Sequence, residues 1–336
     1  MKKGYKRMKL MPRTKLTPRA LFLITLFLFS FTVYGQGTNL ARVETIQFKS
    51  KLTGKTLPYS VVLPPDYEQR KKKDQSGYPV LYLLHGLTGH YSDWLAKTKL
   101  REYAAQYRII IVTPEGNDGW YTDSALVPAD KYETYLLQEL IPDVESRFRA
   151  LKSRQGRAIA GLSMGGYGAL KFGVKYPDKF IFAASMSGAL DVATRPESYL
   201  RFKWEAMRVS VEQTFGPPDN PTRADNDLYK LFRNLPAERF AALPFIYLDC
   251  GTEDGLVTAN RELATILLER KIPHEFRQLP GKHNWEYWGA QVREVLKMAA
   301  QKMTLSKQRV AFTEDKLLYF LSLSTMGTSS REKILN

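Results

Sequence analysis

Apolar runs separated by helix-length stretches dominate the middle of the chain. Six of these runs have the length of strands: "PVLYLLHG", "YRIIIVTPEG", "GRAIAGLS", "KFIFAASMSG", "LPFIYLDCG" and "IPHEFRQLPG". Continuous apolar runs are typical of strands buried on both faces, which occur in parallel sheets covered by helices. The pattern therefore predicts an α/β fold with a mostly parallel central sheet and helices on both of its faces.

Other segments have the length and spacing of helices, namely 131–149, 164–175, 258–271 and 288–303. The first contains Pro142, which lacks a backbone N–H and should kink or restart the helix. Ahead of the parallel strands, the alternating stretch "VETIQFKSKLTGKTLPYSVVLPPDY" turns at Thr53 and Gly54. This alternation predicts an antiparallel N-terminal hairpin.

The two ends of the chain differ from this middle part. Residues 1–35 join a basic stretch to the apolar segment 20–34, which is typical of a secretory signal peptide and is shorter than the roughly 20 residues that span a bilayer. We expect this signal to be cleaved, with no stable membrane insertion of the chain afterwards. An uncleaved N-terminal membrane anchor is the alternative. Either way, we expect the globular part to be secreted or periplasmic. We predict one domain at 40–303, with an insertion at 191–242, and a tail at 304–336 without an assigned role. The insertion either covers a pocket or is an excursion of surface helices.

Charge and cysteine content narrow the possible functions. The net charge is +16, but residues 1–35 contribute eight lysines and arginines and no acid, so +8 remains. No basic helix or zinc-finger spacing accompanies this charge, and we therefore exclude a nucleic-acid partner. The acids in "DNPTRADND" do not match a calcium loop, and we expect no metal or cofactor. Cys250 is the only cysteine, so an intrachain disulfide is impossible, and its surroundings indicate a buried apolar side chain.

The candidate chemistry begins at Ser163, in the stretch "AIAGLSMGGYGAL". Gly161 and Gly165 flank this serine in a G-x-S-x-G pattern that directly follows a predicted strand and precedes a predicted helix. A turn of this kind projects the serine hydroxyl above the edge of the sheet. Ser163 is therefore a candidate nucleophile, and a glycine-rich turn without chemistry is the alternative.

A serine hydroxyl needs a base, and the base needs an acid to orient it. Where the nucleophile lies on a strand–turn–helix corner, the acid and then the histidine follow it along the chain. His274 lies within a predicted strand, whereas His283 lies in the loop "LPGKHNWEYW", so we choose His283 as the base. Asp249 ends a strand and Asp254 lies in the loop after it, so we choose Asp254 as the acid, with Glu253 as a further alternative.

Attack on an ester produces an oxyanion that needs preorganised donors. We expect one from the backbone N–H of Met164, which follows the nucleophile, and one from Leu87 in the loop "HGLTGHYSDW". Gly86 and four aromatic residues near these loops are candidate substrate-binding residues, although core packing would explain each aromatic residue equally well. The aromatic candidates are Trp94, Trp120, Tyr121 and Trp285.

Together these motifs resemble the esterase D group of α/β-hydrolases, which includes S-formylglutathione hydrolases, acetyl and feruloyl esterases, and mycolyltransferases. The resemblance covers about residues 43–303 and rests on "LLHGLTGHYSDW", "GLSMGGYGAL", "LDCGTEDGLV" and "PGKHNWEYW". It implies an α/β-hydrolase fold without a cofactor. It also implies the same site residues: Ser163, Asp254 and His283 as nucleophile, acid and base, and Leu87 and Met164 as oxyanion donors.

Within this group, an exported esterase that acts through an acyl-enzyme on short-acyl or sugar-linked esters fits the sequence best. Its expected partners are small-molecule or carbohydrate esters. Formylglutathione hydrolases typically have a cysteine after "GLT", where this chain has Gly89. Transfer of the acyl group to a sugar acceptor is a second interpretation. A non-catalytic binding protein built on a hydrolase scaffold is a third.

Overall fold

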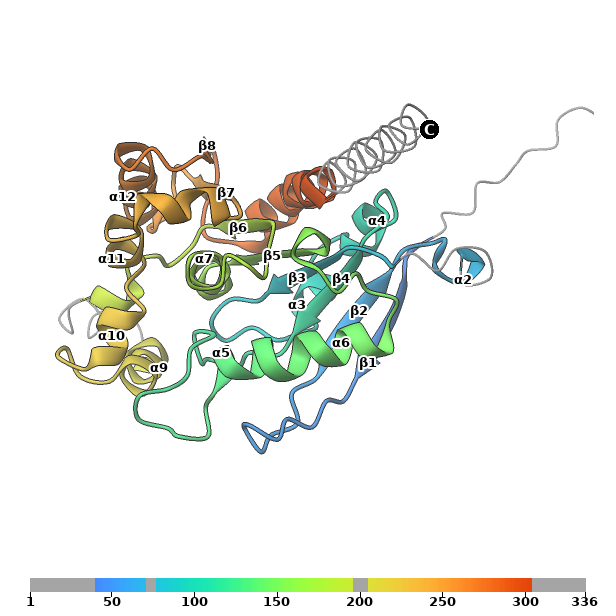
Figure 1. Cartoon of the computed structure of the whole chain (residues 1–336), viewed down its shortest axis with the longest axis horizontal. Helices are drawn as coiled ribbons and strands as arrows, with labels where there is room; N and C mark the ends of the chain where they lie inside the picture. Colours follow the sequence, from blue (N-terminus) through green and yellow to red (C-terminus); the bar gives the residue numbers. More distant parts are fainter. Residues whose placement is uncertain (1–39, 71–76, 196–204, 304–336) are drawn as a thin grey trace, which may run out of the picture. The chain divides into compact units, whose positions relative to one another are not determined.

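A computed structural model of the chain describes residues 40–70, 77–195 and 205–303 (Figure 1). The predicted signal peptide at 1–35 and the predicted tail at 304–336 lie outside these residues. No helix in the described ranges combines the length and the apolar character needed to cross a bilayer.

Eight strands form one sheet in the order β1-β2-β4-β3-β5-β6-β7-β8. Neighbouring strands from β4 to β8 run parallel, whereas β2 is antiparallel to both β1 and β4. The predicted sheet, with its antiparallel N-terminal hairpin, is therefore confirmed. The strands are β1 Arg42–Ile46, β2 Tyr59–Leu63, β3 Val80–Leu84, β4 Ile110–Pro114, β5 Arg157–Leu162, β6 Phe182–Met186, β7 Phe245–Gly251 and β8 His274–Leu279.

Both faces of the sheet are covered by helices, as the apolar runs predict. Along β3, Tyr82 and Leu84 belong to one core, and Leu81 and Leu83 belong to the other. The first core is packed by helices α6 (Ile141–Arg147), α7 (Met164–Lys175) and α12 (Val257–Glu269). The second core is packed by α3 (Asp93–Lys97), α4 (Leu100–Ala104) and the helical residues 285–303. The carboxyl ends of the parallel strands all lie at the same end of the sheet, and the loops that follow them can form a site there.

The helices follow the predicted segments closely. The predicted helices 164–175, 258–271 and 288–303 correspond to α7, α12 and residues 285–303. The helices with assigned bounds are α2 Tyr67–Arg70, α3 Asp93–Lys97, α4 Leu100–Ala104, α5 Tyr132–Tyr135, α6 Ile141–Arg147, α7 Met164–Lys175, α9 Glu205–Phe215, α10 Pro221–Asp225, α11 Leu228–Arg233 and α12 Val257–Glu269.

The predicted helix 131–149 shows the effect of its proline. It consists of α5, a π-helical segment Leu136–Leu140, and α6, in which Pro142 is the second residue. Proline cannot donate the backbone hydrogen bond that would continue the preceding helix, so the turn before it widens and the helix restarts. The expected break at Pro142 is therefore confirmed.

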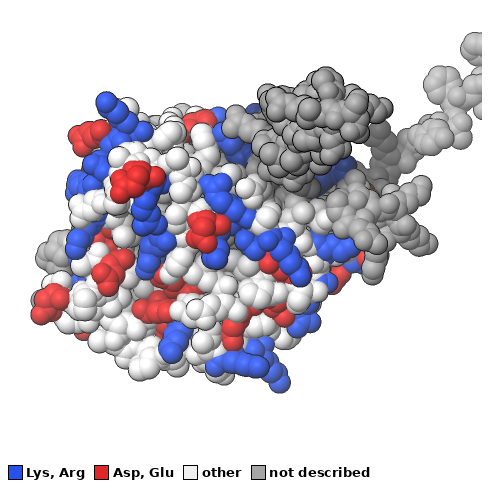
Figure 2. All heavy atoms as spheres, in the orientation of Figure 1, with Lys and Arg blue, Asp and Glu red and all other residues white. Residues whose placement is uncertain are grey.

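The described part of the insertion 191–242 is helical. It contains α9, α10, α11 and two 3₁₀ segments, Val192–Thr194 and Ala237–Ala242. The end of α9 is joined to the loop after β4, because the backbone N–H groups of Ala125 and Leu126 donate to the carbonyl oxygens of Thr214 and Gln213. Over the face seen in Figure 2, acidic and basic side chains are interspersed among the described residues, and no stripe of one sign runs across them.

Candidate active site

Ser163 stands at the sharp turn between β5 and α7. Its φ of +53° lies in a region that side chains larger than glycine rarely adopt. A Cβ atom on Gly161 would lie 2.4 Å from the Gly165 backbone, and one on Gly165 would lie 2.6 Å from the carbonyl oxygens of Leu84 and His85. Both flanking glycines are therefore needed for strand and helix to approach this closely.

Backbone hydrogen bonds hold the serine in this strained conformation. Its N–H donates to the carbonyl oxygen of Met186 at 3.0 Å, at the end of β6. Its own carbonyl oxygen accepts the N–H groups of Tyr167 at 3.0 Å and Ala189 at 3.2 Å. The side chain is thus presented above the carboxyl ends of the strands by a backbone that is fixed on both sides.

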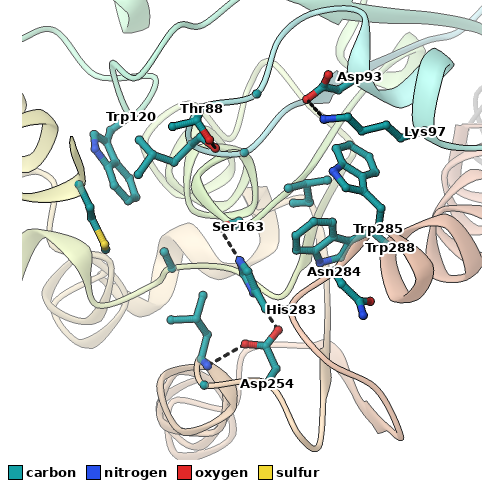
Figure 3. A pocket seen from close by; sticks show the side chains of 18 of the residues that line it. Thr88, Asp93, Lys97, Trp120, Ser163, Asp254, His283, Asn284, Trp285 and Trp288 are labelled. Atoms are coloured by element: carbon teal, nitrogen blue, oxygen red, sulfur yellow. Dashed lines mark hydrogen bonds and ion pairs between the residues drawn. The ribbon is translucent and has the colours of Figure 1, made fainter. Parts of the chain in front are cut away.

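A hydrogen-bonded chain of three side chains meets at this edge (Figure 3). The Nε2 atom of His283 lies 3.0 Å from the Oγ atom of Ser163, and its Nδ1 atom lies 2.9 Å from Oδ2 of Asp254. Asp254 follows β7 and His283 follows β8, so the three residues come from the ends of three parallel strands. The structure therefore brings together the three residues that we predicted as nucleophile, acid and base.

The environment of Asp254 favours its ionised form. Burial by itself would raise the pKa of this carboxyl, but the hydrogen bond and charge of His283 and the N–H of Leu256, 2.8 Å from Oδ1, outweigh it and lower the pKa below the ordinary 3.8. A carboxylate at Nδ1 holds the imidazole proton on that nitrogen. This arrangement leaves Nε2 free to accept the proton of the Ser163 hydroxyl.

The alternative acid and base residues lie outside this chain of hydrogen bonds. His274 is the first residue of β8, so it lies at the amino-terminal ends of the parallel strands, opposite to Ser163 at their carboxyl ends. Its Nδ1 lies 2.8 Å from the Ile272 carbonyl oxygen. Asp249 is completely buried within β7, and this burial raises its pKa to about 7. Glu253 points to solvent, 3.7 Å from the ammonium group of Lys282.

The two predicted oxyanion donors border the serine. Met164 is the first residue of α7, and Leu87 lines the same cavity as Ser163. Neither backbone N–H has a hydrogen-bond acceptor among the described residues. A Cβ on Gly86 would lie 2.6 Å from the Leu162 side chain and 3.4 Å from the Cβ of Ser163, so glycine lets this loop approach Ser163. Both N–H groups are thus available to a bound oxyanion.

A cavity of about 640 Å³ surrounds Ser163 and His283. Trp120 lies on one side of the serine, and Trp285 lies on the other with the Lys97–Asp93 ion pair, whose N···O distance is 2.9 Å (Figure 3). Gly86, Trp120 and Trp285 therefore line the cavity, as predicted. Within the described ranges, no three His, Cys, Asp or Glu side chains group as a metal site requires.

Two predicted substrate-binding residues are corrected by the structure. Trp94 is completely buried; its indole N–H donates to the Leu84 carbonyl oxygen, and its ring packs edge-on against Trp285 with the ring centres 5.3 Å apart. Tyr121 is also buried, and its hydroxyl donates to the His85 carbonyl oxygen at 3.2 Å. Neither residue is among those that line the cavity, so both rings belong to the packing behind its wall.

Several residues that line the cavity were not predicted from the sequence. Trp288 packs edge-on against His283 with a ring-centre distance of 4.8 Å; its spacing of three from Trp285 on one helix was the signal that could have identified it. Arg195 and Met207, both from the insertion, also line the cavity. No sequence pattern marks these two residues individually.

Comparisons with known proteins find esterases and acyltransferases among the relatives of this chain. Residues 50–298 match the family model described as "Putative esterase". An acetyl esterase of Caldicellulosiruptor saccharolyticus is 31% identical over 73% of this chain and 93% of its own length. The diacylglycerol acyltransferase/mycolyltransferase Ag85B of Mycobacterium leprae (strain TN) is 29% identical over 65% of this chain and 74% of its own length.

Among solved structures, a ferulic acid esterase superposes with a TM-score of 0.67 at 28% identity, covering 79% of this chain and 99% of the esterase. The family resemblance and the α/β-hydrolase fold predicted from the motifs are both confirmed. The chain therefore belongs to the putative esterase family and is an esterase-type enzyme with the α/β-hydrolase fold.

Proposed function

We propose that the protein is an exported serine carboxylesterase that cleaves short-acyl or sugar-linked esters through an acyl-enzyme. The observation that carries this proposal is the continuous chain from Ser163 through His283 to Asp254, with N···O distances of 3.0 and 2.9 Å. The similarity to an acetyl esterase and to a ferulic acid esterase supports the substrate class.

In this reaction, the Ser163 hydroxyl attacks the ester carbonyl carbon while its proton passes to Nε2 of His283. The Asp254 carboxylate stabilises the imidazolium that forms. The oxyanion accepts hydrogen bonds from the N–H groups of Leu87 and Met164. His283 then returns the proton to the leaving alkoxide, and the acyl group remains on Ser163. Water, activated by the same imidazole, releases the acid and restores the serine.

A formylglutathione hydrolase activity fits this loop poorly. Those enzymes typically have a cysteine at the position of Gly89. A Cβ on Gly89 would lie 2.9 Å from the Gly86 carbonyl oxygen and 3.0 Å from a carboxylate oxygen of Asp93. A cysteine at this position would therefore need the loop next to the nucleophile to move.

Acyl transfer to an alcohol is the second candidate function, favoured by the similarity to a mycolyltransferase. The His283 side chain is about one-third exposed, at 36%, so either water or an alcohol can approach the acyl-enzyme from the cavity. Product analysis with added sugar acceptors distinguishes the two: transfer gives an acylated acceptor, and hydrolysis gives only free acid.

Labelling with a fluorophosphonate probe tests the serine-hydrolase mechanism. We expect one label per folded chain, lost in Ser163→Ala and retained in Ser146→Ala, which removes an exposed hydroxyl outside the cavity. Absence of labelling on folded protein would favour the non-catalytic binding protein. Hydrolysis of 4-nitrophenyl esters of graded length, beside acetylated and feruloylated xylan, then defines the substrate.

Export is proposed from residues 1–35, which resemble a signal peptide. N-terminal sequencing of the protein recovered outside the cytoplasm provides the test. A mature chain that begins near Gly35 supports a cleaved signal, whereas an intact N-terminus in a membrane fraction supports the anchor.

A further inference from the structure

Trp120 and the next residue, Tyr121, form an unusual turn beside the cavity. Their φ angles are +52° and +50°, so two consecutive residues with bulky side chains adopt a left-handed backbone. Such conformations persist only where the surrounding structure holds them, and they occur preferentially at functional sites. Something must therefore fix this turn.

The fixing group is a buried lysine on α7, the helix that begins directly after the nucleophile. Lys171 is completely buried, and its ammonium group donates to the carbonyl oxygen of Tyr121 at 2.7 Å, to Oγ1 of Thr122 at 2.6 Å and to a carboxylate oxygen of Glu133 at 2.6 Å. The Thr122 hydroxyl in turn donates to the Trp120 carbonyl oxygen at 2.9 Å. Two of the three ammonium hydrogens thus bind the strained turn.

A buried ammonium is stable only when each of its hydrogens has an acceptor. Burial lowers the pKa of Lys171 to about 8, against the opposing influence of the Glu133 carboxylate. Movement of the turn would leave this buried charge with a single acceptor, the carboxylate of Glu133. The lysine therefore resists any change in the position of Trp120.

The Trp120 side chain is also held by the insertion. Its indole N–H donates to the Ser210 hydroxyl of α9 at 3.1 Å, and its ring packs edge-on against Tyr167 at 6.1 Å. Although only 1% exposed, Trp120 lines the cavity, so it acts as a fixed wall.

The proton transfers determine which part of an ester meets this wall. His283 must reach the oxygen of the leaving alcohol, so the alcohol lies on the side of the imidazole. That side is bordered by Trp288, which contacts His283, and by Trp285. Trp120 lies on the other side of Ser163 in Figure 3, where the acyl chain remains after the alcohol leaves.

We propose that Lys171 is a positioning residue that fixes Trp120 as the end wall of the acyl side of the cavity and thereby sets the acyl length that the enzyme accepts. This inference rests on the proposed esterase function. Trp120 is the residue that determines specificity, and Lys171 acts through it.

The first test removes the wall. In Trp120→Ala, we expect the ratio of kcat/KM for 4-nitrophenyl octanoate to that for 4-nitrophenyl acetate to rise about tenfold or more. The ratio between 4-nitrophenyl acetate and 1-naphthyl acetate, which differ only in the alcohol, should stay within about twofold of the wild-type value. A changed alcohol ratio with an unchanged acyl ratio would overturn the assignment of the two sides.

The second test releases the turn. In Lys171→Met, we expect the same octanoate-to-acetate ratio to rise about threefold or more. Lys175→Met is the matched control, because Lys175 also binds Glu133, at 2.7 Å, but has no hydrogen bond to the turn among the described residues. Thr122→Val removes the bridging hydroxyl with little change in shape and gives the same readout if Lys171→Met does not fold. Because each ratio comes from one preparation, it is independent of the amount of folded enzyme.

Wild-type ratios in both Lys171→Met and Thr122→Val would overturn the inference. So would an equal change in Lys175→Met, since that would indicate a general loosening of the fold. Ser163→Ala serves as the blank in every assay. Esterase activity that survives in Ser163→Ala contradicts the proposed function itself, a result distinct from Ser163-dependent activity with unchanged acyl ratios.

Discussion

Asp254 binds His283 with one carboxylate oxygen and the backbone with the other. Its Oδ2 lies 2.9 Å from the imidazole Nδ1, and its Oδ1 accepts the N–H of Leu256 at 2.8 Å. The second contact prevents the carboxylate from rotating, so it fixes both the orientation and the tautomer of the imidazole.

Replacement of Asp254 by Asn should therefore damage catalysis without changing the shape of the site. An amide can donate to Nδ1, which favours the tautomer with its proton on Nε2, and that nitrogen can then no longer accept the serine proton. We expect kcat for 4-nitrophenyl acetate to fall on the order of 10⁴-fold, with a small change in KM. Glu253→Gln, one residue away and exposed, is the control and should retain full activity. If Asp254→Asn keeps more than about a tenth of kcat, this mechanism is wrong.

The fold and the chain of site residues could largely be predicted from the sequence, for a physical reason. Parallel strands end at one edge of the sheet, so loops that follow them meet there, whatever their separation along the chain. Ser163, Asp254 and His283 each follow such a strand. Continuous apolar runs identified the strands, and the order of the motifs identified the loops.

Tertiary packing could not be predicted in the same way. Trp94 and Trp285 both flank motif loops, and only the folded chain shows that Trp94 is buried beneath Trp285. Lys171 follows the apolar stretch "GAL" on α7, and lysine is a residue type that usually lies at the surface. It is nevertheless fully buried, because the carboxylate of Glu133, from a distant segment, binds its ammonium group. Arg195 and Met207 of the insertion line the cavity because of how the chain folds, and no sequence motif marks them.

The glycines of the elbow give a second prediction. A Cβ on Gly161 would lie 2.4 Å from the Gly165 backbone, and no flexible side chain is there to move away. Gly161→Ala should therefore either prevent folding or displace Ser163, with loss of at least about 100-fold in kcat/KM. Gly289→Ala is the control, since its Cβ would meet only Thr98 at an ordinary 3.6 Å. Thermal unfolding and hydrolysis of 4-nitrophenyl acetate measure both variants, and a fully active Gly161→Ala would contradict the need for this close approach.

Cys250 should be unreactive in the folded protein. It is completely buried at the end of β7, and burial raises the pKa of its thiol to about 12. The thiolate fraction at pH 8 is then on the order of 10⁻⁴, and access is blocked as well. We expect no reaction with Ellman's reagent in native buffer and one thiol per chain in guanidinium chloride. Rapid native labelling would instead indicate that this end of the strand opens.

Glu133 should make the stability of the fold depend on pH in the acid range. Burial alone would raise its pKa, but the charges and hydrogen bonds of Lys171 and Lys175 outweigh burial and lower the pKa from 4.5 to about 2. A carboxyl whose pKa is lower in the folded state stabilises the fold above its unfolded pKa. This contribution, roughly 3 kcal/mol at most, is lost as the pH falls from about 4.5 to 2.

The measurement is urea unfolding of wild type and Glu133→Gln at several pH values between 6 and 2.5. At pH 6 the wild type should have the larger free energy of unfolding, because Gln leaves the buried ammonium of Lys171 without its counter-charge. The difference between the two proteins should shrink as the pH falls below about 4.5, since the wild-type carboxyl takes up its proton on unfolding. A difference that stays constant across this range would mean that Glu133 is not the ionised partner of Lys171. The buried ammonium group that binds the Trp120 turn would then need another negatively charged partner.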